Sequence, residues 1–239
     1  YHVLLISKPG IPVSSHIDHL NERYMYTGGE AVVLDFAQRD FPEYYVGRNL
    51  HIFEQLSTEP WFGDTIAIGS HSAGANLAAL TASRSGRVSH LIYSAGNPFG
   101  YFMNIINKQR KRENDSLHLA EVQFEYWDRV VKDKNQDVPV PGSEVANKSV
   151  YLFQTTVFNT LLNLDIPVLV TYGTKDDCAY ANDLLRFESI KRQKSYMHFK
   201  DYIGRDHNYF AVDADGNPNH EEYYWQTVAR FWMDWLISN

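Results

Sequence analysis

The chain has 239 residues, of which 44% are hydrophobic, 21% charged and 14% aromatic. This composition excludes a disordered chain, and the length indicates one domain with room for an insertion. A net charge of −7 argues against a general nucleic-acid binder, which would usually be basic. The single cysteine, Cys178, permits neither an internal disulfide nor a cysteine-based zinc site.

No apolar run approaches the ~18 residues that a membrane span needs, so we expect no membrane span. The first residues, 1–6, lack the basic-then-apolar layout of a signal peptide. We therefore expect a soluble protein, cytoplasmic by default, and leave open a removed leader, upstream strands and the oligomeric state.

Short apolar runs recur along the chain and predict strands. Runs that are continuous rather than alternating are typical of a parallel sheet covered on both faces. The predicted strands are residues 3–6, 31–34, 65–68, 88–93, 167–172 and 196–199.

Helical patterns lie between these runs. Residues 73–82 are almost all small residues and leucine, and the C-terminal stretch has large apolar residues spaced every three or four positions. The latter are Tyr224, Val228, Phe231, Trp232, Trp235 and Leu236. Alternating strands and helices predict an α/β fold with a doubly wound, mostly parallel sheet.

One long segment interrupts this alternation. Between residues 94 and 166 the sequence predicts no strand, and residues 105–160 are polar and helical, with interspersed aromatics. Insertions beyond the strand ends of an α/β sheet overhang the place where such sheets bind ligands. We therefore predict a core of residues 1–104 and 161–239 with a helical cap insertion at 105–160.

The predicted strand 65–68 leads through Gly69 into S-H-S-A-G at positions 70–74 and then into a helix. A serine nucleophile in a tight strand-to-helix turn needs small residues two positions before and after it. Ser72 has Ser70 and Gly74 there, whereas Ser70 would have the bulky Ile68. Ser72 is the predicted nucleophile, with the Ala73 amide as an oxyanion donor at the helix N-terminus; an ordinary turn is the alternative.

This order of strand, turn, helix, insertion and further strands resembles the α/β-hydrolase superfamily over nearly the whole chain. The resemblance implies that residues 3–6 correspond to the third strand of that fold. It also implies a triad in the order Ser, Asp or Glu, His, and carboxylic ester hydrolysis as the default reaction.

The predicted strand 167–172 is followed by G-T-K-D at 173–176, which is similar to the acid loop of the superfamily. The resemblance implies that Asp176 is the triad acid. Asp177 remains a rival because the sequence does not exclude a slip of one residue, and a turn-forming pair is a further alternative.

His207 lies in G-R-D-H-N-Y-F at 204–210, between the last predicted strand and the final helix. The superfamily carries its base there, so the resemblance implies that His207 is the base. We expect His71 to point away from the site if Ser72 faces outward, and Asp206 to form hydrogen bonds within its loop.

The resemblance places the second oxyanion donor in the loop after the first strand, here residues 7–12. Pro9 and Pro12 have no amide hydrogen, which leaves Lys8, Gly10 and Ile11. Gly10 and Ile11 are the preferred pair, and a purely structural loop is the alternative.

No cofactor or metal is expected. Gly28 and Gly29 lack the later glycine of a dinucleotide fingerprint, and residues 213–217 predict a turn rather than a calcium loop. The basic run at 108–112 is typical of a solvated helix face, although it could attract an anionic substrate group.

These residues predict a cofactor-independent serine hydrolase that acts on a small-molecule ester or acyl substrate. Ser72 would attack, His207 would take its proton, and Asp176 would orient the imidazole. Two alternatives stay open: a peptidase or amidase of the same superfamily, and a catalytically silent protein that binds a small molecule. The irregular loop at residues 8–12 is the main support for the silent alternative.

Overall fold

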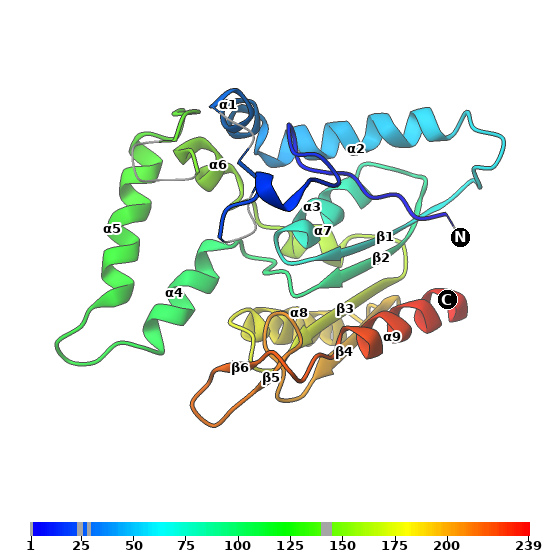
Figure 1. Cartoon of the computed structure of the whole chain (residues 1–239). Helices are drawn as coiled ribbons and strands as arrows, with labels where there is room; N and C mark the ends of the chain where they lie inside the picture. The colour runs from blue at the N-terminus through cyan, green and yellow to red at the C-terminus, as the bar shows by residue number, and fades with distance from the viewer. Residues whose placement is uncertain (1, 23–25, 28–29, 140–144) are drawn as a thin grey trace. The chain divides into compact units, whose positions relative to one another are not determined.

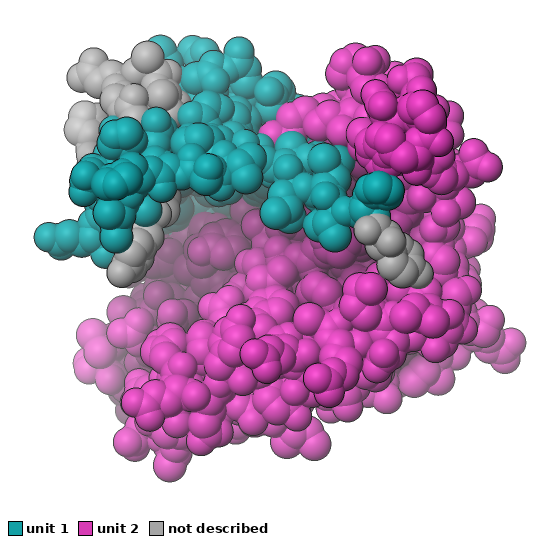
Figure 2. Space-filling view, turned by 45° about the vertical axis from the view of Figure 1, so that its right-hand side comes forward, with its two compact units in different colours: residues 1–45, 125–153 teal, residues 46–124, 154–239 magenta. Residues whose placement is uncertain are grey.

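The computed structural model describes residues 2–22, 26–27, 30–139 and 145–239, with the backbone alone at 30–33. The chain divides into two compact units, distinguished by colour in Figure 2. Unit 1 comprises residues 1–45 and 125–153, and unit 2 comprises residues 46–124 and 154–239. Ser72, Asp176 and His207 therefore all belong to unit 2.

Unit 2 contains a parallel sheet whose four strands follow chain order. The strands are β1 (Ile66–His71), β2 (Val88–Ser94), β3 (Val168–Gly173) and β4 (Met197–Tyr202). They confirm the strands predicted at 65–68, 88–93, 167–172 and 196–199. Right-handed crossovers that advance in one direction across a sheet place their helices on the same face.

Alternate residues of the central strands are buried on opposite faces of the sheet. On one face Leu91 and Val168 belong to a core that also includes residues of α2, α3, α7 and α8. On the other face Ile92 and Leu169 pack against Trp235 of the C-terminal helix α9. Figure 1 shows the sheet and these helices. Helices thus cover both faces, as the predicted fold class requires.

The helices of unit 2 confirm the predictions for residues 73–82 and for the C-terminus. They are α3 (Ala73–Ala82), α4 (Phe102–Arg110), α7 (Phe158–Leu162), α8 (Ala179–Lys191) and α9 (Trp225–Ser238); α2 (Pro42–Leu56) and α5 (Leu119–Lys132) have residues in both units. A short hairpin, β5 (Ala211–Val212) and β6 (Pro218–Asn219), encloses the turn predicted at 213–217. In that turn the Asp213 carboxylate accepts the amides of Asp215 and Asn217.

Unit 1 contains the 3-10 helix η1 (Ile17–His19) and the helices α1 (Glu30–Arg39) and α6 (Asn147–Leu152). Side chains join its two chain segments. The Ser149 hydroxyl donates to the carbonyl oxygen of Asp40, and the ring centroids of Tyr45 and Phe153 lie 6.3 Å apart. Tyr45 donates to the Asp40 carboxylate at 2.8 Å, so Asp40 is a polar centre of this unit.

Two predicted strands are wrong, and both lie in unit 1. Residues 3–6 form no strand, and Val3 and Leu5 are 84% and 75% exposed. Residues 31–34 lie inside helix α1. An apolar run of four residues does not distinguish a strand from a helix, and here Asp35 and Arg39 form an (i, i+4) ion pair typical of a helix.

The described part of the segment 95–167 contains helices and no strand, as the sequence predicted. The cap boundaries at 105 and 160 remain a prediction. Gly28 and Gly29 lie outside the described residues. Among the described helices, none is long and apolar enough to cross a membrane.

Candidate functional site

Ser72 occupies the turn between β1 and α3. Its backbone has φ 58° and ψ −130°, a conformation that non-glycine residues rarely adopt and that must be held by the surrounding structure. Its amide donates to the carbonyl oxygen of Ser94 at 2.8 Å, which ties the turn to β2. Ala73 begins α3, so its amide has no acceptor within the helix. This amide is available at the positive end of the helix dipole.

The two small neighbours of Ser72 have different roles. The Ser70 hydroxyl donates to the carbonyl oxygen of Ile92 at 2.5 Å, so it is committed to the sheet. A Cβ added to Gly74 would meet no described atom within 4 Å. The steric reason that the sequence suggested for Gly74 is therefore wrong for the described residues, although the strained turn itself is present.

His207 and Asp176 lie in the loops that follow β4 and β3. His207 Nε2 lies 2.8 Å from Ser72 Oγ, and His207 Nδ1 lies 2.8 Å from Asp176 Oδ2. The structure therefore brings together the three side chains that the sequence singled out.

Asp176 and Asp177 have distinct surroundings. Asp176 is 6% exposed and its second oxygen accepts the Cys178 amide at 3.1 Å. The Asp177 carboxylate instead pairs with Lys111 of α4 at 2.9 Å. The geometry thus pairs the histidine with Asp176 rather than with Asp177.

The pKa shifts of His207 and Asp176 favour a protonated imidazole beside an ionised carboxylate. Burial disfavours the charged form of His207, but the hydrogen bond and charge of Asp176 outweigh it and raise the pKa of His207. Burial likewise opposes ionisation of Asp176, but the hydrogen bond and charge of His207 lower the pKa of Asp176 overall. Each partner stabilises the charged form of the other.

Gly173 lets the two loops approach each other. A Cβ at this position would collide with the carbonyl oxygens of Arg205 and Asp206. The Lys175 amide also donates to the Arg205 oxygen at 2.8 Å. Asp206 accepts the amides of Asn208 and Phe210, which is the loop role expected for it. The backbone therefore fixes the acid loop against the histidine loop.

The expectation that His71 points away from the site is wrong, because its ring packs against that of His207. Its ring lies 5.1 Å from the ring of His207 and 5.0 Å from that of Trp225. Its Nδ1 lies 3.0 Å from Ser94 Oγ, and Tyr209 OH lies 2.5 Å from the same oxygen. The available signal was the position of His71 and Ser94 at the carboxyl ends of adjacent strands.

The predicted second oxyanion donor lies in unit 1. Within the described turn the Ile11 amide donates to the carbonyl oxygen of Lys8 at 3.0 Å, and Gly10 has φ 69°. The Gly10 amide is thus the freer of the two preferred donors. Because Ser72 belongs to unit 2, the second donor stays a prediction.

One group of potential metal ligands occurs among the described residues, and it overlaps this site. Ligand atoms of Asp176, Cys178 and His207 lie within 4.8 Å of one another. Asp176 and His207 are already joined by a hydrogen bond, and burial raises the pKa of the Cys178 thiol well above its usual value. The group thus consists of the two hydrogen-bonded side chains of the site and one buried thiol.

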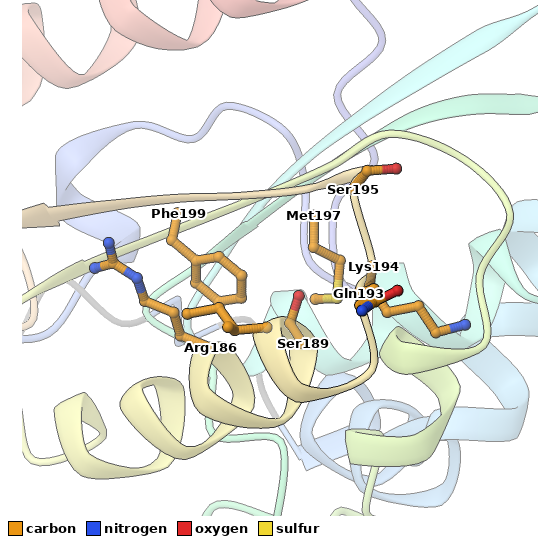
Figure 3. A pocket seen from close by; sticks show the side chains of 8 residues that line it. Arg186, Ser189, Gln193, Lys194, Ser195, Met197 and Phe199 are labelled. Atoms are coloured by element: carbon orange, nitrogen blue, oxygen red, sulfur yellow. The ribbon is translucent and has the colours of Figure 1, made fainter.

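Two surface cavities of unit 2 lie elsewhere. One, of about 470 Å³, lies between α8 and β4 (Figure 3) and is lined by Arg186, Ser189, Ile190, Gln193, Lys194, Ser195, Met197 and Phe199. The other, of about 640 Å³, is lined by residues of 82–86 and 160–166. Neither includes Ser72, Asp176 or His207, so we assign neither to the substrate.

The sequence matches no protein-family model and no curated protein. Among solved structures, Est1E from Butyrivibrio proteoclasticus is 14% identical with a TM-score of 0.53, over 86% of this chain and 72% of that chain. A second structure, of Est1E from the same organism with ferulic acid bound, is 15% identical with a TM-score of 0.52. The match covers 83% of this chain and 70% of that chain. A puromycin-hydrolyzing peptidase from Mycobacterium tuberculosis is 14% identical with a TM-score of 0.45; the match covers 72% of this chain and 23% of the peptidase.

At these identities the likeness concerns the fold. The Est1E structures cover most of this chain, and the parallel sheet of unit 2 has helices on both faces. The turn at Ser72 joins a strand directly to a helix. The chain therefore has the α/β-hydrolase fold.

Proposed function

We propose that this chain is a serine hydrolase that cleaves a carboxylic ester of a small molecule through an acyl-enzyme intermediate. The observation that carries the proposal is the pair of 2.8 Å hydrogen bonds from Ser72 to His207 and from His207 to Asp176. A serine hydroxyl is a weak nucleophile until a base takes its proton, and the base needs an orienting carboxylate. These three side chains are suited to those parts.

In the acylation step His207 Nε2 accepts the proton of Ser72 as Ser72 Oγ bonds to the ester carbonyl carbon. The carbonyl oxygen becomes an oxyanion, for which we propose the Ala73 amide as one donor. The predicted second donor is the amide of Gly10, because the Ile11 amide already donates to Lys8. The imidazolium then protonates the alcohol oxygen as the carbon–oxygen bond breaks. The alcohol leaves, and the acyl group remains on Ser72.

Deacylation repeats these steps with water as the nucleophile. His207 Nε2 takes one proton from a water molecule, whose oxygen bonds to the acyl carbon. The second tetrahedral intermediate collapses, the bond to Ser72 Oγ breaks, and His207 returns the proton to that oxygen. The carboxylic acid leaves and the starting arrangement is restored, so no cofactor is consumed.

The ester preference comes from the resemblance and from the fold comparison. Est1E, with the same fold, was solved with ferulic acid bound, which supports an ester of a carboxylic acid as the substrate class. The aromatic residues within 105–160 fit two roles equally well: they could line a pocket for an apolar acyl or alcohol group, or form the packed core of the cap.

The test compares p-nitrophenyl esters of increasing acyl length with the matched p-nitroanilides. The wild-type chain is assayed beside Ser72→Ala and Ser70→Ala, because Ser70 is a serine two residues away that is bonded to the sheet. We expect ester turnover in the wild type and in Ser70→Ala, and a loss of roughly 10⁴-fold or more in Ser72→Ala.

Two outcomes would contradict the proposal. Faster cleavage of the anilides than of the esters would indicate a peptidase or amidase. Tight binding of an ester without turnover by the folded protein would indicate the silent binding protein.

A further inference from the structure

A row of polar side chains crosses the carboxyl ends of three strands. In the sheet register His71 of β1 is the partner of Ser94 of β2, and Ser94 is the partner of Thr171 of β3. Partners in register lie on the same face of a sheet. Ser94 and Thr171 follow Ile92 and Leu169 by two residues, so the row continues the face that packs on α9.

Tyr209 completes this row from the histidine loop. Its hydroxyl lies 2.5 Å from Ser94 Oγ and 2.9 Å from Thr171 Oγ1, and the residue is fully buried. His71 Nδ1 lies 3.0 Å from Ser94 Oγ, and His71 Nε2 lies 3.4 Å from Asn208 Oδ1. One continuous chain of hydrogen bonds thus runs from Thr171 through Tyr209, Ser94 and His71 to Asn208.

The direction of the chain follows from its end at Asn208. An amide oxygen only accepts, so His71 Nε2 carries the proton, and Nδ1 of a neutral imidazole accepts from Ser94. Ser94 then accepts from Tyr209, and Tyr209 accepts from Thr171. Each hydroxyl donates once, and all the donors in the chain are satisfied.

The surroundings of His71 favour its neutral form. Burial and then the nearby charge of His207 lower the pKa of His71, whereas Asn208, Asp176 and Asp206 oppose that change. The rings of His207, Tyr209 and Trp225 pack around it. A protonated His71 would need Ser94 as an acceptor and would reverse the order of the chain.

The backbone of Tyr209 is held in an unfavourable conformation. Its φ is 61°, which a bulky residue rarely adopts unless the surrounding structure fixes it. The two hydrogen bonds of its buried hydroxyl, with the contacts of its ring to Tyr202 and Trp225, supply that constraint. His207 precedes Tyr209 by two residues and Asn208 precedes it by one.

We infer that this chain of hydrogen bonds positions His207 for proton transfer, and that His71 is the positioning residue at its end. The chain of hydrogen bonds fixes the three consecutive residues 207–209. His71 packs on His207 and is hydrogen-bonded to Asn208, while Ser94 and Thr171 hold Tyr209. His71 acts through His207 and Asn208. The inference rests on the proposed function of His207 as the base.

The experiment measures kcat, KM and the rate at which a fluorophosphonate labels Ser72, in His71→Phe, Tyr209→Phe and the double variant. Each single change keeps a ring of similar size and removes hydrogen bonds. We expect each to lower kcat and the labelling rate roughly 10- to 100-fold, because small displacements of a catalytic group have effects of that size. KM should change little.

The double variant tests whether the two residues act through one chain. The effects of substitutions within one hydrogen-bond network are not additive. We therefore expect the kcat of the double variant to be no more than about twofold below that of the worse single variant. His90→Phe is the matched control, since His90 is a half-buried histidine of β2 whose ring contacts Trp235 of α9. It should leave the rates unchanged.

His71→Asn separates hydrogen bonding from packing, and it serves if a Phe variant does not fold. An asparagine amide oxygen lies near the position of the imidazole Nδ1 and can still accept from Ser94. We expect His71→Asn to retain more of the rate than His71→Phe. The opposite ranking would show that ring packing alone matters and would overturn the inference.

Two further outcomes are decisive. An active wild type with unchanged kcat in His71→Phe and Tyr209→Phe, or with fully additive losses in the double variant, would overturn the inference and leave the proposed function intact. A folded wild type that neither reacts with the fluorophosphonate nor hydrolyses any ester would overturn the proposed function itself.

Discussion

Short apolar runs followed by polar residues occur in both units, but they form different structures in unit 2 and in unit 1. In unit 2 the runs are paired strands, and the loops after them bring Ser72, Asp176 and His207 together. In unit 1 residues 3–6 are unpaired and residues 31–34 are helical. An apolar run thus predicts a strand reliably only where neighbouring strands supply its backbone partners.

The largest expected effect on activity tests which carboxylate of the acid loop is paired with His207. Asp176→Asn should lower kcat/KM by about 10⁴-fold, because the amide no longer stabilises the imidazolium. Asp177→Asn should lower it by less than about 5-fold, since it breaks only a partly exposed ion pair with Lys111. Steady-state kinetics of the two purified variants check this.

A reversal of that ranking would mean that the loop is shifted by one residue. The structural description of the acid loop would then be wrong at the position that matters most.

Gly173 offers the next test, because the close approach of two loops depends on it. Gly173→Ala should cost about 1–3 kcal/mol of unfolding free energy, since the added methyl meets backbone oxygens that cannot move independently. Activity should fall as well, because the acid and histidine loops separate. Gly86→Ala is the control, since a Cβ there meets no described atom within 4 Å. Urea titrations that gave equal stabilities for both variants would refute this account of the loops.

The contrast between the units can be measured directly with one substitution at two places. Leu169 in β3 is 1% exposed, whereas Leu5 in unit 1 is 75% exposed. Leu169→Ala should destabilise the protein by about 2–5 kcal/mol, and Leu5→Ala should stay within about 0.5 kcal/mol. A large loss at Leu5 in thermal or urea unfolding would show that residues 3–6 are buried after all.

The smallest effect concerns pH. The base must be neutral to accept a proton, so kcat/KM should fall as the pH falls through the pKa of His207. Asp176 raises that pKa, so the midpoint of the acid limb should lie above the usual value of about 6.5. In Asp176→Asn, whose residual rate requires a sensitive assay, the midpoint should move to lower pH. A wild-type midpoint below 6.5 would contradict the assigned surroundings of His207.

The candidate site was predictable from the sequence because its parts are local. Each part lies at or just after the end of a strand: the small residues around Ser72, the glycine three residues before Asp176, and the loop around His207. The fold class was predictable for the same reason, since β1 to β4 and the helices between them carry strong patterns.

The remaining features depend on contacts between distant residues. The contact of His71 with His207 depends on how a loop more than 100 residues later packs against β1, which no local pattern records. The strained backbone of Tyr209 and the commitment of the Ile11 amide to Lys8 likewise arise only in the folded chain. In each case the residue type allowed several roles, and packing selected one.

The most direct test of the central claim is to expose the folded protein to a fluorophosphonate and to map the adduct by mass spectrometry. Ser72→Ala and Ser70→Ala are treated in parallel. The account predicts a single adduct on the peptide that contains Ser72, present in the wild type and in Ser70→Ala and absent in Ser72→Ala. An adduct on another serine, or none on the folded wild type, would contradict it.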